Sequence, residues 1–203
     1  MNRKQTTSVP QPLPHQHECL AKIGECLRKG ISPILFVMAS GLGKTYTAAF
    51  AYQMFRKMAK RARVLFLAHQ VDLLDQAKDS FEKLFRDQIT YGHYDGRVKR
   101  LGTEAVFATL QSTRAALEWQ TKPKHRKIFG RKDFDVIIVD ESHHGQAPTY
   151  KEVIQYFRPK LLIGMTATPN RADLQDIRDI FGNEVFNLDL EEALTEGLLT
   201  PVH

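Results

Sequence analysis

The sequence predicts an α/β fold, in which a mostly parallel sheet carries helices on both faces. Short apolar runs rich in β-branched and aromatic residues alternate with longer segments of helical periodicity. Some runs, such as 136–139 (VIIV), are apolar at every position, as expected for strands buried on both faces. The chain has 203 residues, of which 42% are hydrophobic. That length supports one sizeable core but not two such domains.

The elements can be assigned in order along the chain. Apolar residues at helical spacing predict a first helix at 15–28, which Gly30 and Pro33 bring to an end. Residues 1–12 are expected to be a flexible tail, and residues 13–203 the folded domain. The later elements are expected as a strand at 33–37, a helix at 44–58, a strand at 64–68, a helix at 71–85, an irregular region, a strand at 105–108, a short helix, a basic loop at 122–132, a strand at 136–139, a helix near 150–157, a strand at 161–165, a helix near 174–181, a strand at 184–188 and a last helix ending at Gly197.

Composition limits the class of protein. The formal net charge is +6, so the surface should attract polyanions, although a membrane surface would fit equally. The only two cysteines, Cys19 and Cys26, lie seven residues apart on a predicted helix, which places their Cα atoms about 10 Å apart, too far for a disulfide. We therefore expect reduced thiols, and the lack of a run approaching ~20 apolar residues predicts a cytoplasmic protein.

The segment 38–45 (MASGLGKT) has the composition of a phosphate-binding loop. It follows an expected strand and opens an expected helix, so backbone N–H groups and the positive end of the helix dipole meet at one anionic site. Lys44 is expected to reach the β- and γ-phosphates of a nucleotide, and Thr45 to ligate Mg²⁺. The segment departs from the general pattern at Met38, which stands where that pattern has glycine. The alternative interpretation is a glycine-containing turn before an ordinary helix. The predicted nucleotide-binding residues here are Ser40, Gly41, Leu42, Gly43, Lys44 and Thr45.

An acidic pair stands at the carboxyl end of the expected strand 136–139, where open α/β sheets bind their ligands. We expect Asp140 to hold Mg²⁺ and Glu141 to orient and deprotonate the attacking water. Taken alone, the pair could also be a solvated acidic turn that caps the next helix. Together with the phosphate loop it predicts hydrolysis of ATP, with Lys44, Asp140 and Glu141 as the catalytic residues.

The order of the motifs is more specific than any single motif. The phosphate loop is followed by 64–70 (VLFLAHQ), 73–77 (LLDQA), 108–112 (ATLQS), 140–143 (DESH) and 166–169 (TATP). This order resembles the first RecA-like domain of superfamily 2 helicases and translocases, over about residues 11–203. It is most similar to the group that contains the motor subunits of type I and type III restriction enzymes and the excision-repair DNA helicases.

The resemblance implies further roles. Gln16 matches the glutamine that reads adenine, because an amide can pair with an adenine edge at two positions. The family's usual flanking arginine and tyrosine are Leu13 and His15 here, and a plain surface glutamine is the alternative. Three residues match those that couple the state of the γ-phosphate to domain movement: His143, Thr166 and Thr168.

Four residues match segments that line the nucleic-acid track in this family: His69, Gln70, Thr109 and Gln111. Hydroxyl and amide side chains at strand-to-helix junctions suit phosphate contacts that do not read sequence. Helix capping is the alternative role for Thr109. Two basic stretches, 56–63 and 122–132, also suit nucleic acid, although such runs are more often solvated faces.

We therefore expect the ATP-binding half of a nucleic-acid-dependent motor, in which hydrolysis drives strand translocation or unwinding in the full-length protein. DNA is favoured over RNA as the partner. The family's second RecA-like domain supplies an arginine finger, and the resemblance implies that this domain is missing from the chain, which should therefore bind nucleotide weakly and hydrolyse it slowly. The alternatives are an RNA-directed helicase and an ATP-dependent interaction module without mechanical activity.

Overall fold

The computed structural model describes residues 8–96, 98–140, 147–167, 173–182 and 184–200. Within these residues the strands are β1 (Ile34–Met38), β2 (Val64–Ala68), β3 (Tyr91–Tyr94), β4 (Lys99–Arg100), β5 (Ala105–Thr109), β6 (Val136–Asp140), β7 (Leu161–Thr166) and β8 (Glu184–Leu188). The helices are α1 (Pro14–Arg28), α2 (Lys44–Met58), α3 (Val71–Phe85), the 3₁₀ turn η1 (Arg86–Gln88), α4 (Leu110–Gln120), α5 (Ala147–Phe157), α6 (Asp173–Phe181) and α7 (Leu190–Thr195).

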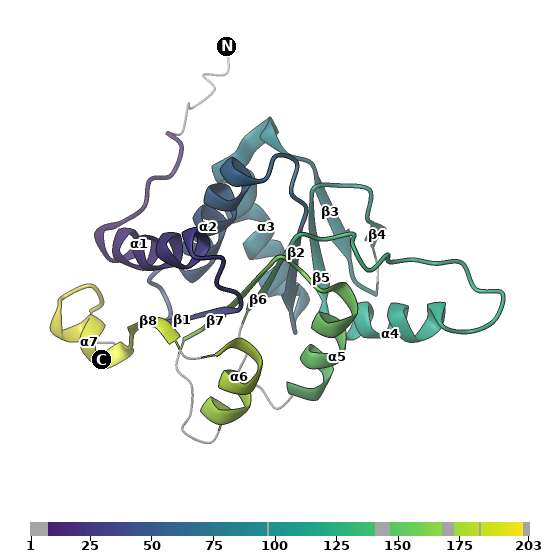
Figure 1. Ribbon diagram of the computed structural model, residues 1–203. Helices are drawn as coiled ribbons and strands as arrows, with labels where there is room; N and C mark the ends of the chain where they lie inside the picture. Colours follow the sequence, from purple (N-terminus) through teal and green to yellow (C-terminus); the bar gives the residue numbers. More distant parts are fainter. Residues whose placement is uncertain (1–7, 97, 141–146, 168–172, 183, 201–203) are drawn as a thin grey trace, which may run out of the picture.

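The strands form one sheet in the order β4-β3-β5-β2-β6-β7-β1-β8 (Figure 1). All pairings are parallel except the one between β3 and the short edge strand β4. The mostly parallel α/β fold predicted from the sequence is thereby confirmed. Parallel strands direct all their carboxyl ends to one edge of the sheet, which is the edge that matters for function.

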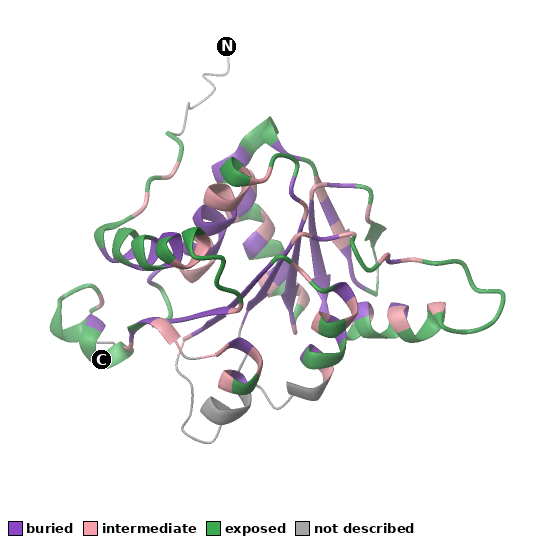
Figure 2. Cartoon of the chain, in the orientation of Figure 1, coloured by how far each residue is buried: buried purple, intermediate pink, exposed green. Residues whose placement is uncertain are grey.

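Helices cover both faces of the sheet, and the central strands are buried between them (Figure 2). Successive side chains of a strand point to opposite faces. In β2, Val64, Phe66 and Ala68 therefore belong to the core beneath α1, α2 and α3. Leu65 and Leu67 belong to the second core, beneath α4, α5 and α6. This two-sided burial explains why the strands read as continuous apolar runs in the sequence.

The region expected to be irregular contains two strands, which is a correction. β3 pairs in parallel with β5, and β4 pairs with β3 through His93 and Arg100. The segment 91–94 (YGHY) lacks an apolar run because it lies near the sheet edge, where alternate residues are only half-buried. The other boundaries moved by a few residues at most. Strands β6 and β7 extend one residue further, to Asp140 and Thr166, α5 begins three residues earlier, and α7 ends before Gly197.

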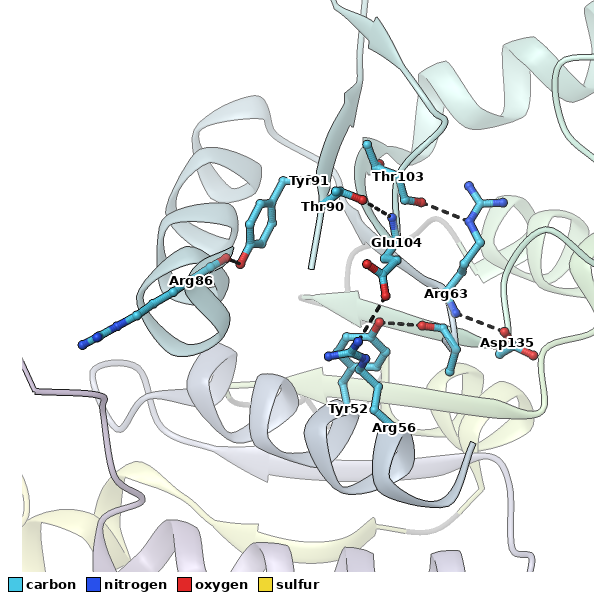
Figure 3. A network of polar contacts seen from close by, with 10 residues as sticks. Tyr52, Arg56, Arg63, Arg86, Thr90, Tyr91, Thr103, Glu104 and Asp135 are labelled. Atoms are coloured by element: carbon cyan, nitrogen blue, oxygen red, sulfur yellow. Dashed lines mark hydrogen bonds and ion pairs between the residues drawn. The ribbon is translucent and has the colours of Figure 1, made fainter. Parts of the chain in front are cut away.

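A polar network joins α2 to the amino-terminal ends of the strands (Figure 3). Arg56 Nη2 donates to Glu104 Oε1 over 3.1 Å, and Arg63 Nε donates to the carbonyl of Thr103 over 3.0 Å. The backbone N–H of Arg63 also donates to Asp135 Oδ2 over 3.0 Å. Two arginines of the first basic stretch are thus used to hold the fold. This supports the structural interpretation of 56–63 over a nucleic-acid surface.

Both cysteines are free thiols, as the helical spacing predicted. Burial raises the pKa of Cys19 to about 12, so this thiol is protonated at neutral pH. In the part of the chain that the structure describes, every helix is too short or too polar to traverse a bilayer.

Candidate functional site

The turn after β1 is shaped by two glycines. Gly41 and Gly43 have φ angles of 88° and 81°, in the left-handed region that glycine enters without steric cost. Gly43 directly precedes the first residue of α2, Lys44. The first N–H groups of a helix lack partners within the helix, so this end of α2 can bind an anion. Leu42 lies between the two glycines but is only 4% exposed, and it packs into the core beneath α1 and α2.

Helix α1 is fixed to the same turn. His15 Nε2 bonds to the carbonyl of Leu42 over 2.9 Å, and Gln16 Nε2 donates to the carbonyls of Leu42 and Gly43, each over 3.2 Å. Gln16 Oε1 accepts from the backbone N–H of Leu13 over 2.9 Å. The structure therefore places Gln16 against the phosphate loop, buried rather than on the surface. Its role in reading adenine stays a prediction.

The acidic motif reaches the same edge of the sheet. Strand β7 lies between β1 and β6, with Thr166 in register with Val37 of β1 and Met165 in register with Asp140 of β6. The three carboxyl ends therefore lie side by side, and Asp140 is the last residue of its strand. A cavity of about 340 Å³ brings the two motifs together, lined by Ser40, Gly41, Gly43, Lys44, Thr45 and Asp140 among others.

Three predicted residues lie outside the described residues: Glu141, His143 and Thr168. Thr166 is described and fully buried at the end of β7, between the strand that leads to the phosphate loop and the strand that carries Asp140. A side chain at this position is adjacent to both motifs. That placement fits a coupling role, which stays a prediction.

Helix α3 contributes lining residues that the sequence did not assign to the nucleotide site. Leu73, Gln76 and Ser80 line the cavity, and so does Tyr46 of α2. Residues 73, 76 and 80 lie on one face of α3, because three and seven residues correspond to about one and two helical turns. The segment 73–77 is one of the motifs on which the family resemblance rests. Its position in that pattern was the sequence signal that could have placed this face of α3 at the nucleotide site.

The predicted nucleic-acid residues lie further along the same edge. Ala68 and Thr109, the last residues of the neighbouring strands β2 and β5, are in register, so His69 and Gln70 lie next to the start of α4. Thr109 Oγ1 accepts from the backbone N–H of Ser112 over 3.2 Å and caps α4. Thr109 therefore has the helix-capping role that the sequence analysis gave as the alternative to nucleic-acid binding. Gln111 is exposed on the first turn of α4.

Comparison of the chain with known protein families and solved structures agrees with this geometry. A family model described as "Type III restriction enzyme, res subunit" matches residues 10–171. The chain belongs to this family. Its fold is that of the first RecA-like domain of the superfamily 2 type, as the order of its motifs predicted.

Individual relatives agree with this assignment. The type I restriction enzyme EcoAI endonuclease subunit of Escherichia coli is 33% identical over 197 residues, covering 96% of this chain and 24% of the relative. A fragment described as an HsdR subunit of a type I restriction enzyme from Vibrio vulnificus YJ016 has a TM-score of 0.66 at 29% identity, covering 92% of this chain and 32% of that one. The type ISP enzyme LlaGI, solved with a DNA substrate mimic, shares the fold at 18% identity, with a TM-score of 0.67 over 93% of this chain and 21% of its own. The chain thus spans about a quarter to a third of the first two relatives.

Proposed function

We propose that this domain binds Mg·ATP in the cavity shared by the phosphate loop and Asp140, and that it supplies the hydrolytic half of a DNA-dependent motor. The observation that carries the proposal is that Lys44, Thr45 and Asp140 line one cavity at the carboxyl edge of the sheet. A lysine, a hydroxyl and a carboxylate are the groups that phosphate and Mg²⁺ require. If the glycine turn only connected β1 to α2, nothing would require the carboxylate of Asp140, two strands away, to line the same cavity.

The donors present fit Mg²⁺. This ion takes oxygen ligands and is usually held by one or two carboxylates together with substrate phosphates and water. Among the described residues, no group of three or more His, Cys, Asp or Glu side chains could hold a metal without such additional ligands. Thr45 and Asp140 would hold the ion jointly with the nucleotide, and the bound ion would neutralise charge that develops on the phosphates.

The remaining work falls to the chain's own residues. Lys44 binds and orients the terminal phosphates, while the amino-terminal end of α2 stabilises their negative charge. Glu141 takes a proton from the attacking water and sets its direction. In a longer protein that carries this domain, Thr166 and its neighbours transmit loss of the γ-phosphate to the nucleic-acid edge, so that hydrolysis drives translocation or unwinding of DNA.

A nucleotide titration tests the site. Fluorescent ATP should bind this chain with Mg²⁺ present, and Lys44→Ala should weaken binding by about 10- to 100-fold, because a charge-assisted hydrogen bond contributes about 1.5–3 kcal/mol. Asp140→Asn should bind nucleotide but lose the gain in affinity that Mg²⁺ brings. Lys60→Ala removes an exposed charge just beyond the carboxyl end of α2, far from the phosphate loop, and serves as the control. Equal affinity of the Lys44 and Lys60 variants would refute the proposal.

A further inference from the structure

Residues 122–132 (KPKHRKIFGRK), here called the basic loop, hold six lysines and arginines and no acid. The whole chain has 29 basic and 23 acidic side chains, an excess of six. The basic loop alone therefore carries as much positive charge as the chain has in excess. All residues from 122 to 127 are exposed. In Figure 1 the loop between α4 and β6 extends away from the sheet, on the side of the molecule opposite α7.

The lysines of the basic loop differ from others that the structure describes. Lys22, Lys78, Lys83 and Lys160 each form an ion pair with a carboxylate. Within the described residues, no ion pair involves Lys122, Lys124, Arg126 or Lys127. Glu118, the last acid before the basic loop, pairs with Arg114, and Asp133, the first acid after it, accepts from the backbone N–H of Gly130 over 2.7 Å. The positive charges of the basic loop are therefore not neutralised by ion pairs with acidic side chains among the described residues.

The ends of the basic loop are fixed to the domain. Gln120 Oε1 accepts from the backbone N–H groups of Ile128 and Phe129 over 3.0 and 2.9 Å. Gln120 Nε2 donates to Tyr156 Oη over 2.7 Å, and that hydroxyl donates to the carbonyl of Phe129 over 2.6 Å. The ring of Phe129 is buried and packs against Tyr94. The charges are thus presented on a prearranged support, which lowers the entropy that binding would cost.

An aromatic pair lies at the start of the basic loop. Trp119 and His125 stack with ring centroids 4.1 Å apart at 26°, and His125 Nδ1 donates to the carbonyl of Trp119 over 2.8 Å. Trp119, the only tryptophan of the chain, is 40% exposed. Exposed aromatic rings beside basic side chains are a combination that binds nucleic acid through stacking and phosphate contacts.

This surface continues to the predicted nucleic-acid edge. Gln111, Ala115 and Trp119 are spaced four residues apart on α4 and so share one side of the helix. Ala115 lines two hollows, one of about 380 Å³ with Gln111 and one of about 440 Å³ with Trp119 and Lys99. The exposed side of α4 is therefore one continuous hollowed surface from Gln111 to the basic loop. Its middle carries one net negative charge, because the single Arg114 pairs with both Glu118 and Glu152, so we expect the DNA contacts at the two ends of this surface rather than at its centre.

We propose that the basic loop and the Trp119–His125 pair form a second DNA-binding surface, which contacts backbone phosphates beyond the track of Thr109 and Gln111. The inference rests on the proposed function in that it takes DNA as the motor's partner. The loop contacts would position the duplex without reading sequence, as phosphate contacts do. An anionic membrane is disfavoured, because Phe129 is buried and Ile128 half-buried, which leaves the loop without an apolar face to insert.

The test compares two variants, each of which loses four positive charges, at different places on the surface. One replaces Lys122, Lys124, Arg126 and Lys127 by Gln. The control replaces Arg28, Lys29, Lys57 and Lys60 by Gln, at the exposed ends of helices that pack on the other face of the sheet. Binding of a labelled 20-base-pair duplex is followed by anisotropy at several salt concentrations. We expect the loop variant to lose at least about tenfold in affinity near 0.1 M salt, and its salt slope to fall by about 2–4, because each phosphate contact contributes about 0.9.

The control should change affinity less than about twofold, since charges more than a Debye length of about 10 Å from the DNA are screened. Equal effects of the two variants would overturn the proposal and leave only general charge attraction. Fluorescence of Trp119 gives an independent readout, because no other tryptophan contributes. It should change on saturation with duplex, and an unchanged signal would overturn the proposal as well.

Two further arms separate the possible outcomes. Phosphatidylserine vesicles and poly-glutamate, matched to the duplex in charge, should alter Trp119 fluorescence much less than DNA does, and an equal response would assign the surface to another polyanion. If the chain binds Mg·ATP while the loop variant binds DNA normally, the second surface is refuted and the nucleotide site stands. If the chain does not bind Mg·ATP while the loop variant still shows weaker DNA binding, the nucleotide site is refuted and the second DNA-binding surface stands.

Discussion

Gly43 contributes both to the phosphate loop before α2 and to the packing of α1 against that loop. It places the end of the phosphate loop in a left-handed conformation before α2, and its carbonyl accepts from Gln16 of α1. A Cβ at this position would collide with Gln16 Nε2. The residue is therefore constrained both by its own backbone angle and by the side chain that crosses over it. This couples the shape of the phosphate loop to the seating of α1.

Replacing Gly43 by alanine should damage the site more than the fold. A left-handed alanine costs about 1–2 kcal/mol, and the displaced amide of Gln16 loses its bonds to the loop. We expect the free energy of unfolding to fall by about 1–3 kcal/mol in urea titrations, with nucleotide affinity reduced by more than about tenfold.

The double variant Gly43→Ala/Gln16→Ala separates the two causes, because it removes the collision and keeps the backbone strain. Its unfolding free energy should exceed the value expected from adding the two single losses. Strict additivity would show that Gln16 does not constrain the loop.

At this scale, the sequence predicted residues whose chemistry is contained in a contiguous motif. Lys44, Thr45 and Asp140 could be found because strand, turn and helix signals flank them, and the parallel sheet brings their strand ends to one edge. Gln76 and Ser80 could not be assigned in the same way. They reach the cavity only because α3 packs beside α2, a contact between elements that spacing within α3 does not reveal.

Among the elements, the strand starts are held together by Asp135. Its carboxylate accepts from the backbone N–H of Arg63 before β2 and pairs with Lys160 Nζ at 2.8 Å before β7. Burial acts to raise the pKa of this carboxyl, but the hydrogen bonds from Lys160 and Arg63 outweigh it and hold the pKa below its usual value. A carboxylate with a lowered pKa stabilises the fold above its unfolded-state pKa of about 3.9, and that stability is lost as pH falls through the folded-state value.

Asp135→Asn should therefore show a defect that depends on pH. At pH 5 to 7 we expect the variant to lose about 1 kcal/mol of unfolding free energy, because Lys160 is largely exposed and its attraction is screened. Below about pH 4 the two proteins should converge, as the unaltered carboxyl becomes protonated. Urea titrations at pH 7, 5, 4 and 3 measure the difference, and a constant gap at all four values would contradict the assigned cause.

The missed strands β3 and β4 show where sequence patterns fail at this scale. Their pairing depends on Gly92, because a Cβ there would collide with the carbonyl of Arg100 and the hydroxyl of Thr103. In the sequence this glycine reads as a breaker of a strand. Only the close approach of the neighbouring backbone reveals that it permits pairing. The buried central strands, whose signal is their own apolar run, were predicted to within about a residue.

For the whole molecule, the nucleotide cavity and the predicted DNA surfaces occupy different parts of one sheet edge. The cavity lies between β1 and β6, whereas His69, Gln70 and the start of α4 lie at β2 and β5. β6 is the strand between β7 and β2, and its last residue is Asp140. An event at the phosphates can therefore reach the DNA edge through directly hydrogen-bonded strands.

This arrangement predicts that the 203-residue chain alone binds Mg·ATP but turns it over slowly. The family resemblance assigns the arginine finger to a second RecA-like domain, and such a residue can raise turnover by 10³–10⁵-fold. We expect phosphate release by the chain alone to be unaffected by duplex DNA, and a longer protein that carries both domains to be stimulated by it. Glu141→Gln in the longer protein should abolish release while ATP stays bound, which shows that the activity belongs to this site. Strong DNA-stimulated release by the chain alone would contradict the prediction, because every group needed for stimulated hydrolysis would then lie within these residues.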